Sequence, residues 1–207
     1  MERYELPKNW VWRRIEEIAD ISAGTSAPQG EQYFSDGKYP FVRTQDVGKL
    51  GRTTCLKNTS DKVNDKAVSE KRLRKAKKGS IVLPKSGASI LTNSRAILGV
   101  DAYIVSHLAI LEPNESLLDS FFFYYWLCTI DMASFSQSDS GYPSLRLSDI
   151  AKIKIPVPPL SEQRRIVKRI EELTRRVEEA RKFIREAESE LAAFTPALLA
   201  KAFRGEL

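Results

Sequence analysis

Polar loops in the first three quarters of the chain carry side chains that could contact DNA. Arg43 and Gln45 follow a short apolar run, and arginine and glutamine form paired hydrogen bonds with the edges of guanine and adenine. Lys85 lies near Gly87 after another apolar run, where a cation can approach a phosphate. Each such loop is more often an ordinary surface turn, so these residues are candidates. The loop candidates are Thr25, Ser26, Arg43, Thr44, Gln45, Lys85, Ser86, Ser89, Asn93, Arg95, Ser138, Tyr142 and Arg146.

The densest basic run, residues 71–78, offers a second kind of contact. Its lysines Lys75, Lys77 and Lys78 could bind the DNA backbone, because nonspecific affinity for DNA comes mainly from neutralised phosphates. The alternative is a solvated helix face anchored by Leu73 and Ala76. The net charge of +6 and the pI of about 9.3 favour a polyanionic partner in either case.

Catalytic and metal-binding motifs are missing from the sequence. Pro158-Pro159 has neither the preceding Asp or Asn nor the following aromatic residue of amino-methyltransferases, and there is no Gly-x-x-x-x-Gly-Lys-Ser/Thr loop. His107 is the sole histidine, and Cys55 and Cys128 lack metal-ligand spacing. We therefore expect no catalytic residue, no metal and no cofactor on this chain.

Residues 1–155 predict an α+β fold in which an irregular, mostly β domain carries peripheral helices. Short runs rich in β-forming residues alternate with loops of Gly, Ser, Asn and Asp. The aromatic run 121–126 predicts a helix packed against the sheet; the alternative is a platform for stacked bases. Strands are expected at residues 39–43, 80–84, 96–100, 102–106, 108–111 and 152–157, and helices at 65–78, 118–129 and 145–150.

A long helix with a heptad pattern is predicted for the second domain, residues 156–207. Ser161 is a suitable N-cap after two prolines, and Pro196 is expected to break the helix and to open a short last helix that Gly205 closes. Apolar residues alternate at spacings of four and three, which is the pattern of a coiled coil. They are Ile166, Ile170, Leu173, Val177, Ala180, Ile184, Ala187, Leu191, Phe194 and Leu198, with Phe183 beside them.

A lone helix cannot bury such a stripe in water, so a partner helix is expected. In a parallel pair Arg176 would face Arg181, which is repulsive. In an antiparallel pair centred near Phe183, Arg176 faces Glu190 and Arg181 faces Glu188. The charges thus predict an antiparallel homodimer; the alternative is that the stripe packs on the chain's own N-terminal domain.

Four segments resemble the DNA specificity subunits of type I restriction-modification systems. They are residues 153–167 (IKIPVPPLSEQRRIV), 199–207 (LAKAFRGEL), 6–12 (LPKNWVW) and 18–25 (IADISAGT). Family members usually carry two recognition domains and two such helices, whereas this sequence has one of each. It resembles a half-size subunit, with the missing half coming from a second copy.

The resemblance implies a recognition domain that reads double-stranded DNA and a helical region that docks modification subunits. Those subunits would hold S-adenosylmethionine and methylate adenine, and restriction subunits would add ATP- and Mg-dependent cleavage. Two alternatives are an assembly fragment that pairs with another specificity chain and a recognition domain of a single-chain restriction-methyltransferase. The sequence shows no signal peptide, and the apolar run 121–127 is too short to span a bilayer, so we expect a cytoplasmic protein without a membrane partner.

Overall fold

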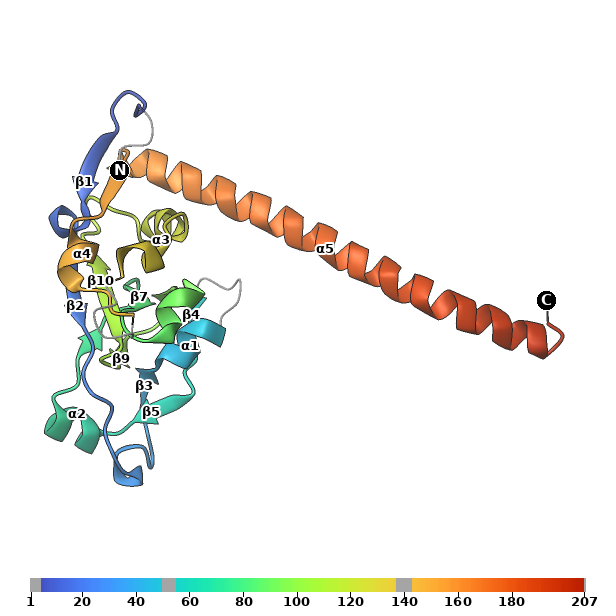
Figure 1. Cartoon of the computed structure of the whole chain (residues 1–207), viewed down its shortest axis with the longest axis horizontal. Helices are drawn as coiled ribbons and strands as arrows, with labels where there is room; N and C mark the ends of the chain where they lie inside the picture. Colours follow the sequence, from blue (N-terminus) through green and yellow to red (C-terminus); the bar gives the residue numbers. More distant parts are fainter. Residues whose placement is uncertain (1–4, 50–54, 137–142, 207) are drawn as a thin grey trace. The chain divides into compact units, whose positions relative to one another are not determined.

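The computed structural model describes residues 5–49, 55–136 and 143–206 of the chain (Figure 1). It consists of two compact units. The first ends at Arg164 and contains all the strands, and the second comprises Arg165–Leu207 and contains a single helix. The expected α+β fold with a long C-terminal helix is confirmed.

A five-stranded sheet forms one layer of the first unit, in the order β2-β10-β7-β8-β4. All neighbours in it are antiparallel except β4 and β8. Each of the four residues of β7 is buried, as expected for an inner strand covered on both faces. The strands are β2 (Ala19–Ala23), β4 (Cys55–Leu56), β7 (Ile81–Pro84), β8 (Ala96–Leu98) and β10 (Leu108–Pro113).

A second sheet has four strands in the order β5-β3-β9-β6. Its two central strands, β3 and β9, are parallel, so their carboxyl ends lie at the same edge. Buried residues of both sheets, among them Phe41 and Ile110, form one hydrophobic core. The strands are β3 (Tyr39–Val42), β5 (Asp61–Val63), β6 (Lys75–Ala76) and β9 (Ala102–Ile104).

Short helices surround the sheets. The side chain of Asn64 caps α2 by accepting a hydrogen bond from the Ala67 amide at 3.0 Å, and Asp119 caps α3 in the same way. The buried Phe122 and Phe123 of α3 confirm that the aromatic run packs in the core. The helices are α1 (Thr44–Lys49), α2 (Asp65–Lys71), α3 (Ser120–Cys128) and α4 (Leu147–Ala151), with 3-10 turns η1 (Ile15–Glu17), η2 (Glu31–Tyr33), η3 (Ala88–Thr92) and η4 (Met132–Phe135).

The proline-rich junction before the long helix is fastened by a buried glutamine. Strands β1 (Val11–Arg14) and β11 (Lys154–Val157) form a separate antiparallel pair, and α5 (Leu160–Phe203) begins three residues after β11. Gln163 is fully buried in the first turn of α5. Its amide group donates to the carbonyls of Leu117 and Pro158 at 2.9 and 2.8 Å, and its side-chain oxygen accepts from the Asp119 amide at 2.8 Å. Because these bonds use its donors and its acceptor, Gln163 fixes the start of the helix within the first unit.

The expected helix over residues 65–78 is wrong in its second half. The helix α2 ends at Lys71, Arg72 adopts a left-handed conformation with φ of 46°, and Lys75–Ala76 form strand β6. Leu73 and Ala76 are buried, as expected, but they anchor an extended segment that pairs with β9. Tertiary pairing therefore overrides the helix propensity of the lysine-rich run.

The expected break at Pro196 is also wrong. The helix α5 runs for 44 residues with Pro196 inside it, and there is no separate last helix in the described chain. Proline removes one backbone hydrogen bond, but the alanines and leucines on both sides are strong helix formers. The end of the helix is as expected: Gly205 has φ of 72°, and the Glu206 amide donates to the Lys201 carbonyl at 3.0 Å.

Arg95 and Asn93 have structural roles that conflict with their selection as DNA contacts. Arg95 is buried, and its guanidinium donates to the carbonyls of Leu127, Ile130 and Asn93. The side-chain oxygen of Asn93 accepts from this guanidinium and from the Met132 amide. The pair joins the end of η3 to α3 and η4, a contact between distant segments that the sequence does not reveal.

No helix in the described ranges combines the length and the apolarity needed to cross a bilayer.

We predict that Arg95→Ala lowers the free energy of unfolding by about 3 kcal/mol, because it removes a buried guanidinium that donates to the carbonyls of Leu127, Ile130 and Asn93. Urea denaturation of the full chain measures this change. The matched control is Arg74→Ala, an exposed arginine, for which we expect a change within about 0.5 kcal/mol. Equal effects of the two substitutions would show that Arg95 does not hold α3 and η4 in place.

Candidate nucleic-acid interface

Five polar segments meet at one end of the two sheets. Backbone hydrogen bonds tie them together: the Ser106 amide donates to Thr25 at 2.8 Å, the Lys85 amide to His107 at 2.9 Å, and the Leu145 amide to Lys85 at 2.9 Å. We call this surface the loop edge. It comprises residues 24–26, 43–45, 85–89, 105–107 and 143–146.

The strand order explains why these segments converge. Strands β2 and β7 end at this edge, and β10, which lies between them, begins there. The parallel strands β3 and β9 also end there, and the Val105 amide donates to the Val42 carbonyl at 3.1 Å. Gly24 is required for this close packing, because a Cβ atom at that position would lie 2.2 Å from the Ile104 carbonyl oxygen.

Six of the loop candidates lie on the loop edge outside residues 43–45. Ser26 and Arg146 are exposed, and the others are partly buried. Thr25 Oγ1 accepts from the Arg74 amide at 3.1 Å, and Ser89 Oγ donates to the Ser86 carbonyl at 3.0 Å. These bonds hold the loops in shape. The six residues are Thr25, Ser26, Lys85, Ser86, Ser89 and Arg146.

The segment after β3 also reaches the loop edge, but its arginine is already engaged. Arg43 pairs with Asp61, and its guanidinium lies 5.6 and 5.5 Å from the ring centres of Phe34 and Phe41. Gln45, in the first turn of α1, is exposed, and Thr44 is partly buried. Gln45 is therefore the more accessible group of this segment.

The basic run does not form one continuous track. Lys75 pairs with Asp101 at 2.9 Å; the Lys78 amide and the Lys75 ammonium together hold the pKa of Asp101 below its usual value. Lys77 and Lys78 line a surface hollow together with five carboxylates, those of Glu16, Glu17, Asp20, Glu112 and Glu115. These lysines lie apart from the loop edge.

The two ends of the β2/β10 pair differ in charge. At the far end from the loops, Asp20 and Glu112 are directly opposite each other in the strand register. Like charges at such a position repel each other and would also repel phosphate. At the loop end, the charged candidates are Lys85, Arg146 and Arg43, of which Arg43 pairs with Asp61. The charge distribution thus favours the loop edge as the side that faces DNA.

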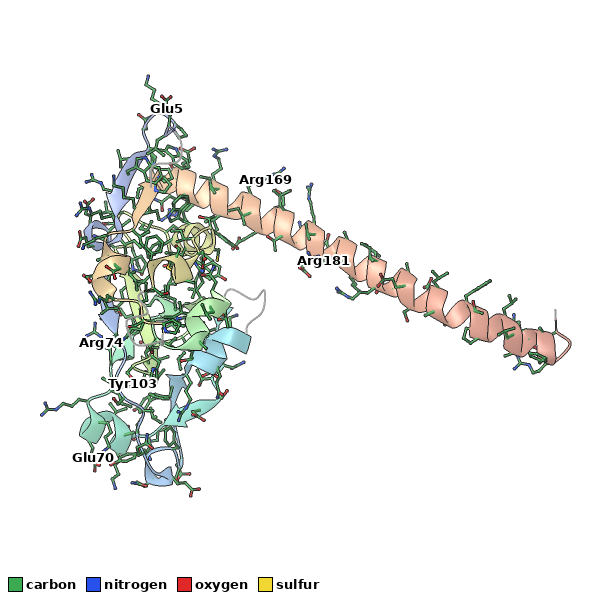
Figure 2. All side chains as sticks on the ribbon, in the orientation of Figure 1. Glu5, Glu70, Arg74, Tyr103, Arg169 and Arg181 are labelled. Carbon is green, nitrogen blue, oxygen red and sulfur yellow. The ribbon has the colours of Figure 1, made fainter. Side chains whose placement is uncertain are left out.

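One residue of the loop edge, His107, and one neighbour of it, Arg74, were not among the sequence candidates. Arg74, labelled with Tyr103 in Figure 2, directly precedes β6, whose Lys75 lies opposite Tyr103 of β9. The Arg74 amide donates to Thr25 Oγ1. Nothing in the basic run distinguishes it from its neighbours. His107 is exposed in the turn between β9 and β10, and its side chain contacts Ser86. The sequence signal that could have identified His107 is the short gap between two β-prone runs, where a turn is expected. Candidates Ser138 and Tyr142 lie outside the described residues.

Known proteins that are similar to this chain in sequence or in structure agree with one another. The Type I restriction enzyme MjaIX specificity subunit of Methanocaldococcus jannaschii is 32% identical over 157 residues, which cover 75% of this chain and 35% of that protein. The Escherichia coli EcoDI specificity subunit is 26% identical and covers 98% and 43%. The crystal structure of the HsdS subunit from Thermoanaerobacter tengcongensis has a TM-score of 0.69 at 26% identity, covering 99% and 47%. The chain spans less than half the length of each of these relatives.

Residues 7–187 match the family described as "Type I restriction modification DNA specificity domain". This range includes the sheets, the loop edge and most of α5. The chain therefore belongs to the type I restriction-modification DNA specificity family.

Proposed function

We propose that this chain recognises a specific DNA sequence as the specificity subunit of a type I restriction-modification complex, and that the loop edge faces the DNA. The observation that carries this proposal is the convergence of five polar segments at the sheet end opposite the Asp20–Glu112 pair. Loops that are held by strand ends can present several side chains to one groove in a fixed arrangement.

The second unit supports a role in pairing. It consists of one helix, so no other element of the unit can cover its apolar stripe. Leu173, Val177, Ile184, Leu191 and Phe194 are 44–74% exposed. Full burial of a large apolar side chain contributes about 1.5–3 kcal/mol before entropy is subtracted, so a partner helix along this stripe would be strongly favoured. We propose that a second copy of the chain supplies it.

Charges on α5 favour the antiparallel arrangement of the two copies. Within one helix, Arg176 pairs with Glu172 at 2.7 Å and Arg181 with Glu178 at 3.2 Å. In the antiparallel pair the same arginines would also approach Glu190 and Glu188 of the second copy. Exposed ion pairs contribute about 0–1 kcal/mol each, so they select the orientation while the stripe supplies the affinity.

We also propose how the paired chains engage DNA and the other subunits of the complex. Two copies related by a twofold axis would place two recognition units at opposite ends of the paired helices, and each would read one half-site. Modification subunits would bind the helical region, hold S-adenosylmethionine and methylate adenine; restriction subunits, where present, would use ATP and Mg. In this scheme the chain is a non-catalytic cytoplasmic subunit without a cofactor of its own.

We predict that Arg176→Glu weakens the homodimer, because it places like charges opposite Glu190 at two symmetric contacts. Two lost contacts of about 0.5–1 kcal/mol each correspond to a roughly 5–30-fold higher dissociation constant at low ionic strength. Sedimentation equilibrium measures this constant. The matched control combines Arg176→Glu with Glu190→Arg, which should restore the affinity. A tighter dimer with the single substitution would indicate the parallel arrangement, in which Arg176 faces Arg181.

We predict that Lys85→Ala combined with Arg146→Ala reduces the salt dependence of DNA binding. Each lost phosphate contact should lower the slope of log K against log salt by about one. Fluorescence anisotropy with a random-sequence duplex measures the slope. As the control of equal charge, Lys77→Ala combined with Lys78→Ala should leave the slope unchanged, because these lysines lie among carboxylates. The reverse result would place the DNA on the basic run.

We predict that a host expressing this chain with its modification subunits carries methylated adenines in a symmetric, bipartite site. Identical recognition units related by a twofold axis read inverted repeats. Methylome sequencing reports the site. An asymmetric site would contradict the homodimer and favour pairing with another specificity chain. Methyl transfer by the isolated chain would favour the single-chain restriction-methyltransferase alternative.

A further inference from the structure

The sole histidine of the chain lies on the loop edge and is held at both its backbone and its side chain. His107 is in the turn between β9 and β10, which the Leu108 amide closes by donating to the Val105 carbonyl at 3.1 Å. The His107 carbonyl accepts from the Lys85 amide at 2.9 Å, and the neighbouring Ser106 amide donates to Thr25 at 2.8 Å. The turn is therefore fixed on both sides, by the loops that follow β2 and β7.

The imidazole ring is fixed through one of its two nitrogens. Nδ1 lies 2.7 Å from Ser86 Oγ. Ser86 is itself held, because its carbonyl accepts from Ser89 Oγ and its backbone pairs with Ser144 in a β-bridge. The His107 side chain is exposed, and within the described ranges no hydrogen bond reaches Nε2. An exposed ring that is positioned at one nitrogen leaves the other available to a ligand.

The bond to Ser86 also affects which ligand atom Nε2 can bind. When the serine hydroxyl donates to Nδ1, the neutral ring carries its hydrogen on Nε2; when the ring is protonated, both nitrogens are donors. Nε2 is a donor in both of these states. Acceptors for such a donor on DNA are phosphate oxygens and the N7 and O6 atoms of purines.

We propose that His107 contacts DNA by donating a hydrogen bond from Nε2 to one of these acceptors, and that Ser86 is the positioning residue that orients the ring. This inference rests on the proposed DNA recognition by the loop edge. In this proposal the His107 ring is already oriented before DNA binds, so little side-chain entropy is lost when the complex forms.

A purely structural role is the competing explanation, in which the bond from Ser86 to His107 only fastens the 85–89 loop to the turn. Two substitutions separate these roles, because each retains one end of the ring. The amide of His107→Asn occupies the place of Nδ1 and can keep the bond to Ser86, but it lacks an outer donor. The longer amide of His107→Gln occupies the place of Nε2 and can keep the outer donor.

The experiment uses the full chain and two DNA probes. The wild-type chain first selects a consensus from a library of random-sequence duplexes. Fluorescence anisotropy then measures the affinity of each variant for the consensus duplex and for a scrambled duplex at two salt concentrations. We expect His107→Asn to weaken binding to the consensus about 10-fold, Ser86→Ala about 3-fold, and His107→Gln less than 3-fold. His107→Ala serves as a second truncation. Thermal unfolding of each variant tests whether its affinity was measured on folded protein.

Each outcome has a defined meaning. A loss of affinity for the consensus duplex alone, with an unchanged slope of log K against log salt, supports contact with a base edge. A loss on both duplexes with a slope lower by about one supports contact with a phosphate. Wild-type-like binding by His107→Asn, or a larger loss with His107→Gln than with His107→Asn, would overturn the inference alone. A wild-type chain that binds neither duplex would overturn the proposed function as well.

Discussion

The apolar stripe of α5 is the constraint on which the account of this protein depends. A helix that makes up a whole compact unit has no neighbour within that unit, and side chains such as Leu191 and Phe194 are more than half exposed. Burial of apolar area is the main source of free energy for association, so a surface of this length favours a partner helix. In the proposed homodimer, the charges between the apolar positions would favour the antiparallel orientation. The stripe thereby connects the sequence pattern directly to assembly.

The first unit carries the proposed recognition surface. Its strand order brings the ends of β2, β3, β7 and β9 to one edge, while the opposite end of the β2/β10 pair carries Asp20 and Glu112. Because one end of the unit carries polar groups and the other carries acidic groups, a polyanion is expected to approach the polar end. The buried Gln163 holds the first turn of α5 to the same unit through carbonyls of residues far apart in the sequence.

Much of this architecture could be predicted from local patterns. The strands at 39–43, 80–84 and 108–111 and the helix over the aromatic run follow from alternation and apolar runs, and the heptad pattern gave the long helix. The failures have identifiable physical causes. The run at 71–78 has strong helix formers, but pairing of β6 with β9 determines its structure. Arg95 looks like a surface arginine in the sequence, yet it is buried and donates to the carbonyls of Leu127 in α3 and of Ile130, which follows α3. Arg74 and His107 join the candidate site only through long-range pairing of strands, which no local pattern encodes.

The most direct test of the central claim is the distance between equivalent positions of α5 in the paired chains. A spin label on a cysteine placed at Arg169, with Cys55 and Cys128 replaced by serine, reports this distance by double electron–electron resonance. An antiparallel pair centred near Phe183 places the two labels about 40 Å apart, from a rise of about 1.5 Å per residue. A distance below about 20 Å would indicate a parallel pair, and the absence of dipolar coupling at high protein concentration would contradict pairing of the two copies.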